Sequence, residues 1–187
     1  IVRTRLLQII CSLGISFNAQ AEEPSLQSGD IIFQTSNSKQ SYTIMWASKS
    51  LYSHVGIVEV EGDKRYVVEA ISKVSRTPLE RWIKRGRLER YAVFRYENLS
   101  QDDQKSIIRS AKDFLGRTYD VSFTSGNKEI YCSELVKLAY ESSKLPIGKT
   151  QMVKELDVDN LIVRRLVEKR WQHHPLSKSI KKFDACW

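Results

Sequence analysis

Short apolar runs, several of them rich in β-branched residues, divide the first half of the chain into strand-sized segments. Such runs, when turn residues bound them, are typical of buried or half-buried β-strands. The clearest pair flanks Glu61-Gly62-Asp63-Lys64, a turn signal that predicts a hairpin. We expect strands over residues 31–33, 53–60, 65–71, 74–78 and 91–96.

Helical spacing of apolar residues characterises the second half. An N-cap serine, Ser100, and two acids in the first turn begin a segment whose apolar residues repeat on one face as far as Gly116. We expect a second amphipathic helix over residues 131–143, shorter helices over 41–51 and 78–84, and a last strand over 161–167. No repeat or linker interrupts residues 22–167, so the pattern predicts one α+β domain there, followed by a basic tail over 168–187.

The first 21 residues have the pattern of a secretory signal peptide. Arg3 and Arg5 precede an apolar stretch over residues 6–17, and Ala19-Gln20-Ala21 places small residues at alternate positions before two acids. This predicts export, with cleavage after Ala21, and hence a periplasmic or secreted protein. A buried N-terminal helix or a membrane anchor is the alternative, but the apolar stretch is shorter than the roughly 20 residues that span a bilayer.

Composition and charge limit the classes of partner that we expect the protein to bind. Hydrophobic residues make up 41% and charged residues 28%, a mix typical of a globular protein, and the formal net charge is +8. Loss of Arg3 and Arg5 with the signal segment would lower it by two, to +6. A basic balance favours peripheral contact with an anionic wall polymer or membrane surface. No arginine-rich run with interleaved aromatics is present, so we expect no nucleic-acid partner, and no feature indicates an oligomeric state.

Cys132 stands near the start of the helix predicted over residues 131–143. Unpaired backbone N–H groups and the helix dipole at this end favour the thiolate, which is the nucleophilic form of cysteine. The same N–H groups, including the amide of Cys132, can hold a developing oxyanion. A thiol in this place needs a base, and His54, at the start of a predicted strand, is the candidate, since His173 and His174 lie in the tail.

A base in turn needs an orienting group, and Glu69 is an acid inside an otherwise apolar strand. The hairpin places residues 69–72 approximately opposite His54, so the two side chains can meet. A one-residue change of register would turn Glu69 to the other face. Each residue also fits a structural role: Cys132 as a small packed side chain, His54 as a hydrogen-bonded structural histidine, and Glu69 as a solvated carboxylate.

Five segments, in this order, resemble the permuted papain-like cysteine hydrolases of the NlpC superfamily, and among these the YiiX/YaeF-like amidases. They are Ser28-Gly29-Asp30-Ile31-Ile32-Phe33, Ser53-His54-Val55-Gly56-Ile57-Val58, Val68-Glu69-Ala70, Gly116-x-x-Tyr119-Asp120 and Tyr131-Cys132-Ser133-Glu134-Leu135-Val136. The resemblance runs from about residue 26 to about residue 145. The histidine strand precedes the cysteine helix, which is the order of the permuted branch.

This resemblance implies an α+β fold in which a small antiparallel sheet, partly barrel-like, packs against helices that include the Cys-bearing helix. It implies Cys132 as the nucleophile, His54 as the general base and acid, and Glu69 as the group that orients His54. The chemistry needs no metal and no organic cofactor. The chain also lacks close ligand spacings such as C-x-x-C or H-x-x-x-H.

Further positions match the family more weakly. Tyr131, just before the cysteine, matches a site position that lines the pocket or serves the oxyanion. Tyr119 and Asp120 match a loop near the pocket. Asp30 matches the glycine-aspartate motif, where its role could be structural, capping the turn before the first strand.

The resemblance and the predicted export together indicate an exported cysteine hydrolase that cleaves an amide, in a cell-wall peptide or a related compound, through a thioester intermediate. One alternative is a lipid-directed acyltransferase or thioesterase of the same superfamily. Five residues before His54 would then form an apolar lip for an acyl chain, unless they belong to the core: Ile44, Met45, Trp46, Leu51 and Tyr52. Another alternative is a non-catalytic binding module in which Cys132 forms a disulfide with Cys186.

Overall fold

The structure is a computed structural model that describes residues 25–38, 40–121, 123, 126–148, 150–152 and 184–186. The predicted signal segment and the strand expected over 161–167 lie outside these residues, so they and the domain boundaries at residues 22 and 167 stay predictions. Among the described helices, none combines the length and the apolar character that crossing a membrane requires.

Five antiparallel strands form the central sheet, in the order β4-β3-β2-β1-β5. They are β1 (Ile31–Ser36), β2 (His54–Glu61), β3 (Lys64–Ala70), β4 (Val74–Pro78) and β5 (Gly86–Phe94). Each of the five strands predicted between residues 31 and 96 is present, but β5 begins at Gly86 rather than at Tyr91. The residues from Arg87 to Arg90 are exposed, so they carry no apolar alternation from which the start of this edge strand could be predicted.

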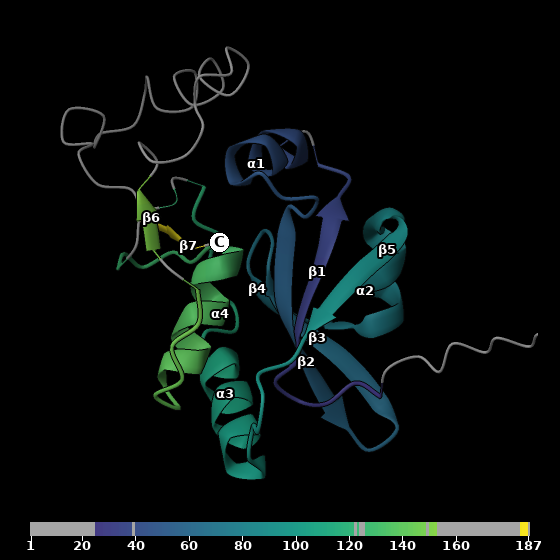
Figure 1. Cartoon of the computed structure of the whole chain (residues 1–187), viewed down its shortest axis with the longest axis vertical. Helices are drawn as coiled ribbons and strands as arrows, with labels where there is room; N and C mark the ends of the chain where they lie inside the picture. Colours follow the sequence, from purple (N-terminus) through teal and green to yellow (C-terminus); the bar gives the residue numbers. More distant parts are fainter. Residues whose placement is uncertain are drawn as a thin grey trace, which may run out of the picture.

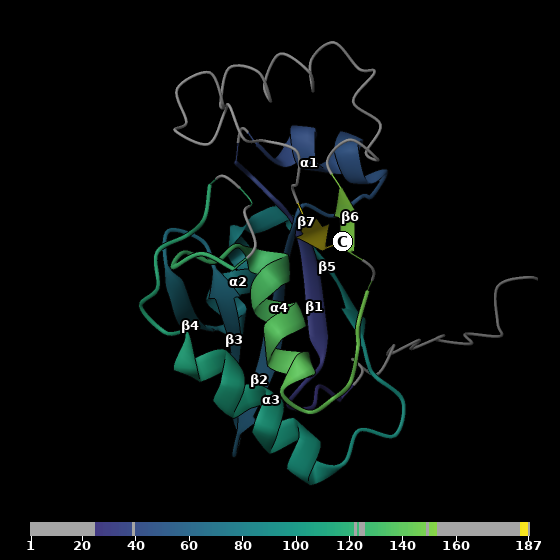
Figure 2. The same cartoon turned by 90° about the vertical axis from the view of Figure 1, so that its left-hand side faces the viewer.

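The described residues form four helices: α1 (Ser41–Ser48), α2 (Leu79–Arg85), α3 (Gln101–Asp113) and α4 (Cys132–Glu141). The start of α3 is as predicted, with a capping box in which Ser100 and Asp103 satisfy each other's backbone N–H groups. Helices α3 and α4 lie on one side of the sheet and α2 on the other (Figures 1 and 2). Two short strands, β6 (Thr150–Met152) and β7 (Asp184–Cys186), pair with each other antiparallel.

The core has two parts, one on each face of the sheet. Val55, Ile57 and Val68 pack with α3 and α4 on one face, and Val58 and Val67 pack with α2 on the other. Neighbouring residues of a strand point to opposite faces, so a strand covered on both faces reads as a continuous apolar run. This explains why β2 and β3 show little alternation between apolar and polar positions, and why a buried carboxylate among them is exceptional.

Candidate active site

His54, Glu69 and Cys132 come together at one end of the sheet. His54 is the first residue of β2, Glu69 lies in β3, and Cys132 is the first residue of α4, which packs against both strands. Cys132 is a free cysteine in the structure, rather than the disulfide partner of Cys186 that the binding-module alternative requires. All three side chains are buried.

The register of the β2–β3 hairpin brings His54 and Glu69 together. Gly56 lies opposite Glu69, so Glu69 is diagonal to His54 on the same face of the sheet. Nε2 of His54 and Oε2 of Glu69 are 2.6 Å apart. A Cβ atom on Gly56 would lie 2.4 Å from Cγ1 of Val67 and 3.4 Å from Cβ of Glu69. The glycine of the His-Val-Gly segment therefore leaves the space that the side chains of β3 occupy.

Glu69 is held as a carboxylate by four donors. Oε1 accepts a hydrogen bond from the hydroxyl of Thr77 at 2.6 Å, and Oε2 accepts from the indole N–H of Trp82 at 2.9 Å, from the guanidinium of Arg85 and from His54. Burial raises the pKa of Glu69, but the hydrogen bond and charge of His54, and the hydrogen bonds from Arg85 and Thr77, lower it below its ordinary value. Glu69 is therefore ionised at neutral pH, and its position is fixed.

Sequence reasoning did not identify the three donors other than His54. Thr77 is the penultimate residue of β4, and Trp82 and Arg85 lie on α2, a helix that covers the face of the sheet bearing Glu69. A buried carboxylate requires partners, so the acid inside an apolar strand was a signal that donors exist. Which residues they are depends on how α2 packs.

Cys132 and His54 are hydrogen-bonded, and each shifts the pKa of the other. Burial disfavours both charged forms, but the hydrogen bonds to Cys132 and Glu69 raise the pKa of His54 to about 9. The hydrogen bond and charge of His54, and the backbone amides of Val55 and Ser133, lower the pKa of the Cys132 thiol. Since Nε2 of His54 faces Glu69, Nδ1 is the nitrogen left for Cys132. Both shifts favour the thiolate and imidazolium form of the pair.

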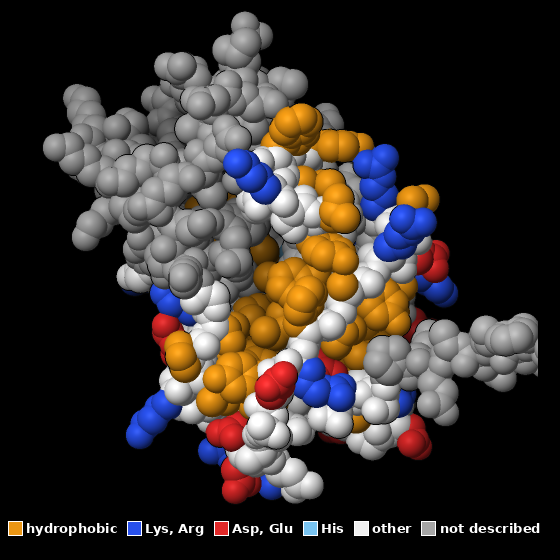
Figure 3. Space-filling model, viewed as in Figure 1, with side chains coloured by type: hydrophobic (Ala, Val, Ile, Leu, Met, Phe, Trp, Pro, Cys, Tyr) orange, Lys and Arg blue, Asp and Glu red, His pale blue; other side chains and the backbone are white. Residues whose placement is uncertain are grey.

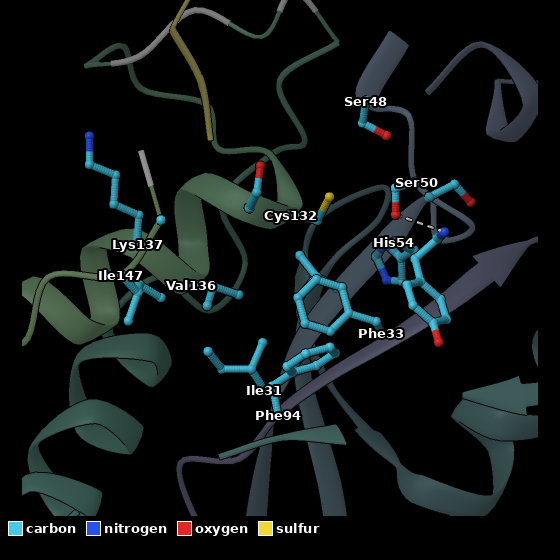
Figure 4. Close-up of a pocket in the computed structure, with 15 residues that line it drawn as sticks. Ile31, Phe33, Ser48, Ser50, His54, Phe94, Cys132, Val136, Lys137 and Ile147 are labelled. Carbon is cyan, nitrogen blue, oxygen red and sulfur yellow. Dashed lines mark hydrogen bonds between the residues drawn. The ribbon is translucent and has the colours of Figure 1, made fainter. Parts of the chain in front are cut away.

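A cavity of about 490 Å³ opens beside this pair. Side chains from α4, β1, β5 and the segments before β2 and after α4 line it, and most of its wall is apolar (Figure 4). Its lining includes Phe33, Phe94, Val136 and Ile147, together with His54 and Cys132 themselves. Sequence reasoning missed these four apolar residues because nothing in their local pattern separates a pocket wall from a core.

The expected apolar lip before His54 is only partly exposed. Trp46 is 62% and Leu51 76% exposed, and Tyr52 lines the cavity, whereas Ile44 and Met45 are half-buried. The segment therefore divides between solvent, cavity and core.

The weaker candidates Tyr131, Tyr119 and Asp120 make contacts outside the set of residues that line the cavity. The ring of Tyr131, almost fully buried, packs against Phe123 with ring centroids 5.4 Å apart, and Tyr119 packs against the same ring at 6.4 Å. Asp120 is buried and accepts a hydrogen bond from the Asn127 side chain at 3.1 Å. None of the three is among the residues that line the described cavity.

Asp30 holds the turn before β1. Its carboxylate accepts hydrogen bonds from the Gln27 N–H at 2.8 Å and from two nitrogens of Arg95 at 2.7 and 2.8 Å. The backbone N–H of Val58 donates to the carbonyl of Asp30 at 2.8 Å, which places Asp30 level with Val58, well along β2 from His54. The structure therefore gives Asp30 contacts that stabilise the turn, and it does not bring Asp30 to the cysteine.

The chain matches proteins already known over most of its length. The family model described as a permuted papain-like amidase enzyme, YaeF/YiiX, C92 family, matches residues 25–177. The uncharacterized protein YiiX of Escherichia coli strain K12 is 38% identical over 182 residues, which are 96% of this chain and 88% of that protein. The crystal structure of the metalloprotein YiiX from Escherichia coli O157:H7 aligns with a TM-score of 0.76 and 39% identity, over 79% of this chain and 83% of that one.

Proposed function

The chain belongs to the permuted papain-like amidases of the YaeF/YiiX, C92 family, and from this we propose that it is an exported hydrolase that cleaves an amide through Cys132, His54 and Glu69. The observation that carries the proposal is the contact of a buried histidine with a cysteine on one side and a fully buried carboxylate on the other. This is the arrangement that activates a cysteine nucleophile and keeps its base in one orientation.

In the first half of the reaction the thiolate of Cys132 attacks the carbonyl carbon of the amide. The charge that develops on the carbonyl oxygen is stabilised by backbone N–H groups at the start of α4, the amide of Cys132 among them. His54 donates its Nδ1 proton to the leaving nitrogen, the C–N bond breaks, and an amine departs. The acyl group remains on the sulfur as a thioester, and His54 is neutral.

Water completes the cycle. His54 accepts a proton from the water that attacks the thioester carbon, and the C–S bond then breaks. A carboxylic acid leaves, and the thiolate and imidazolium are restored. Glu69 does not change its protonation state, because its pKa is held low by four donors, but it stabilises the imidazolium each time it forms.

The described residues do not provide the ligand set of a metal site. The relative from Escherichia coli O157:H7 is described as a metalloprotein, but no group of three or more His, Cys, Asp or Glu side chains lies together in the part of this chain that the structure describes. At the candidate site, Nε2 of His54 is bound to Glu69, which leaves Cys132 Sγ and His54 Nδ1. Zinc sites have three or four protein ligands, so no step is assigned to a metal.

Export and the substrate rest on the sequence. The signal pattern over residues 1–21 supports a periplasmic or secreted enzyme, where cell-wall peptides are abundant amides. The basic charge suits an anionic wall or membrane surface. The apolar cavity beside Cys132 favours the second candidate, action on an acyl lipid, in which the same thioester forms.

A trapping experiment tests the proposed chemistry. The protein is incubated with a panel of wall peptides and N-acyl amides, and intact mass spectrometry after rapid acid quench is used to find an acyl adduct on Cys132. We expect an acyl adduct on Cys132 that hydroxylamine removes. Cys132→Ser should form no thioester, and in His54→Ala the adduct should form far more slowly. A wild-type protein whose Cys132 is unmodified by every amide and unreactive toward iodoacetamide would contradict the proposal.

A further inference from the structure

We propose that the protein binds peripherally to an anionic lipid bilayer through one end of its sheet, where α1, the residues after it and the start of β5 carry exposed apolar side chains beside basic ones. We call this surface the α1–β5 tip. Its apolar residues are Tyr42, Trp46, Leu51 and Leu88, and its basic residues are Lys49, Arg87 and Arg90. The inference goes beyond the proposed function, because membrane binding does not depend on the reaction of Cys132.

The apolar side chains of the α1–β5 tip are open to solvent. Tyr42 is 55% and Trp46 62% exposed, and Leu51 and Leu88 are 76% and 75% exposed. Single exposed apolar residues are normal on a protein surface, but a group of large ones at one end of a molecule marks an interaction site. Figure 3 shows hydrophobic side chains over α1, at the top of the view, with Lys or Arg side chains on either side of them.

Contacts between the two segments bring these residues onto one surface. Tyr42 and Trp46 are four residues apart on α1, so they share a face of the helix. The guanidinium of Arg87 donates to the hydroxyl of Tyr42 at 2.6 Å and lies 5.5 Å from the centroid of its ring. On β1, between the two segments, the hydroxyl of Thr35 donates to the carbonyl of Leu51 at 2.5 Å.

The start of β5 bulges out of the sheet at this end. Ser36 of β1 pairs with Gly86, whereas Gln34 pairs with Tyr91, so the four residues 87–90 of β5 face a single residue of β1. An excess of residues on one strand bends that strand away from its partner. The bulge therefore extends residues 87–90 beyond the end of the sheet, beside α1 (Figure 1).

The backbone of the bulge makes an exposed leucine unexpected there. Leu88 and Glu89 have φ angles of +55° and +54°, in the left-handed region that residues other than glycine, asparagine and aspartate rarely adopt. Folding alone would favour asparagine or glycine at such a turn. A leucine that gains no burial within the protein is explained if a partner accepts its side chain.

The charge of the α1–β5 tip is complementary to an anionic surface. Residues 31–58 include no Asp or Glu, although they include Lys49. In the bulge, Arg87 and Arg90 lie on either side of the acid Glu89. The three basic residues of the tip and this one acid leave a local charge of 3 − 1 = +2. Each basic residue held near an anionic bilayer strengthens binding about fivefold.

A bilayer accounts for the apolar and the basic residues together. Tryptophan and tyrosine combine an apolar ring with a polar group and are enriched where headgroups meet hydrocarbon, as Trp46 and Tyr42 would be. A wall polymer offers anionic groups but no hydrocarbon for Leu51 and Leu88. A second copy of the chain would bring two basic surfaces together, and like charges repel.

Membrane binding by the α1–β5 tip would bring the catalytic cavity to the bilayer. Ser48 and Ser50, which line the cavity, lie between Trp46 and Leu51 in the chain. The opening beside Cys132 is therefore next to the surface that binds the bilayer. Molecules held at that bilayer would reach the cysteine without crossing bulk solvent.

Quenching of Trp46 by brominated lipid tests the inference. The full chain is mixed with vesicles of equal parts phosphatidylglycerol and phosphatidylcholine whose acyl chains carry bromine, and the difference in quenching between the wild type and Trp46→Phe measures Trp46 alone. Residues 1–21 contain no tryptophan, so their own contact with lipid gives no such difference. We expect Trp46 to be quenched, and vesicle binding to weaken with salt and without phosphatidylglycerol. Bound protein whose Trp46 is not quenched would overturn the proposal.

Leu88→Asn separates membrane binding from folding. Asparagine tolerates the left-handed conformation, so thermal stability should be unchanged or higher, while affinity for the anionic vesicles should fall about tenfold. Leu115→Asn is the matched control. Leu115 is 43% exposed and precedes Gly116, whose N–H donates to Val74 of β4, at the edge of the sheet opposite β5. Its replacement should leave the affinity unchanged. Equal vesicle affinity of the wild type and Leu88→Asn would contradict the proposed surface.

The basic residues are tested by charge removal. Lys49→Gln and Arg90→Gln should each weaken binding to the anionic vesicles about fivefold, with little effect on pure phosphatidylcholine, whereas Lys105→Gln, which replaces an exposed lysine of α3, should have a smaller effect. If these variants and Leu88→Asn weaken sedimentation with purified wall polymer but not with vesicles, the partner is the wall and the proposal is wrong.

The alkylation of Cys132 separates this inference from the proposed function. In the absence of lipid, Leu88→Asn and Lys49→Gln should react with iodoacetamide as the wild type does. A Cys132 that is unreactive in every protein would contradict the proposed hydrolase, but it would leave the binding to vesicles and its loss in Leu88→Asn as they are.

Discussion

Glu69 lies diagonally across the β2–β3 hairpin from His54, and its Oε2 is 2.6 Å from Nε2 of the histidine. The carboxylate is fully buried, and the three other groups that donate to it come from β4 and α2. The base of the proposed reaction is therefore oriented from the face of the sheet opposite α3 and α4, while its nucleophile comes from α4.

The pH dependence of alkylation should show the thiolate directly. We expect iodoacetamide to modify Cys132 rapidly well below pH 8.5, near which a free thiol titrates, because His54 lowers the pKa of the thiol. In His54→Ala the reaction should follow an ordinary thiol. Mass spectrometry of the modified peptide measures both, and a wild-type profile that matches His54→Ala would contradict the ion pair.

Hydrolysis should fall at alkaline pH although alkylation does not. The pKa of His54 is raised to about 9, so above this value the histidine loses the proton that the leaving nitrogen needs. Rates of hydrolysis and of alkylation measured in parallel from pH 5 to 10 should therefore diverge above about pH 9. A parallel course of the two profiles would argue against His54 as the general acid.

Glu69→Gln should slow hydrolysis and move its alkaline limb to lower pH. Without the carboxylate the imidazolium of His54 is less stable, so its pKa falls. We expect kcat to decrease on the order of 10²- to 10⁴-fold and the free energy of unfolding to decrease by roughly 1.5–3 kcal/mol, because donors lose a charged acceptor. Denaturant titration and pH–rate profiles provide the two measurements.

Trp82→Phe should shift the pH profile of hydrolysis, whereas the loss of a buried hydrogen bond far from the site should not. It removes the indole donor to Glu69, and loss of a hydrogen bond to a charged group costs about 1.5–3 kcal/mol of stability. Tyr140→Phe is the matched control, since it removes a buried hydroxyl that donates to the carbonyl of Gly29. Both variants should lose stability, but only Trp82→Phe should move the pH profile of hydrolysis. A shifted profile in Tyr140→Phe as well would point to a general loss of structure.

Gly56→Ala tests the close approach of β2 and β3 beneath the site. The added methyl group would lie 2.4 Å from Cγ1 of Val67 and 3.0 Å from the carbonyl oxygen of Val68. Such overpacking typically costs about 1–3 kcal/mol, and the shift of β3 should also disturb Glu69. Unchanged thermal stability in this variant would show that β2 and β3 can move apart to accommodate the methyl group without loss of stability. Gly62→Ala is not a suitable control because Gly62 has a φ of +60°.

Asp30→Asn should change stability without changing the chemistry. Asp30 pairs with Arg95 and caps the turn before β1, so the loss of its charge should cost about 1–3 kcal/mol. The alkylation profile of Cys132 should remain that of the wild type, because Asp30 does not reach the cysteine. A large change in that profile would restore Asp30 as a site residue.

The comparisons confirm the family, and the structure confirms the α+β fold and most of the helices and strands predicted within the described residues. The hairpin at Gly62, the N-cap at Ser100 and the helix that begins at Cys132 were predicted because each depends on neighbouring residues. The start of β5 was predicted wrongly, since an exposed edge strand has no apolar alternation. The resemblance placed Tyr119 and Asp120 in a loop near the pocket and gave Tyr131 a pocket or oxyanion role, but none of the three is among the residues that line the described cavity.

The sequence by itself determined the order of the elements, the helix start that carries Cys132, and the presence of an acid in a strand opposite that of His54. These follow from local periodicity, capping and a turn, which act over a few residues. Only the tertiary structure decided which residues hold Glu69, which wall encloses the cavity and which aromatic side chains stay exposed. Those outcomes depend on how α2 and α4 pack on opposite faces of one sheet. Side chains that are distant in sequence come into contact only when this packing buries both faces.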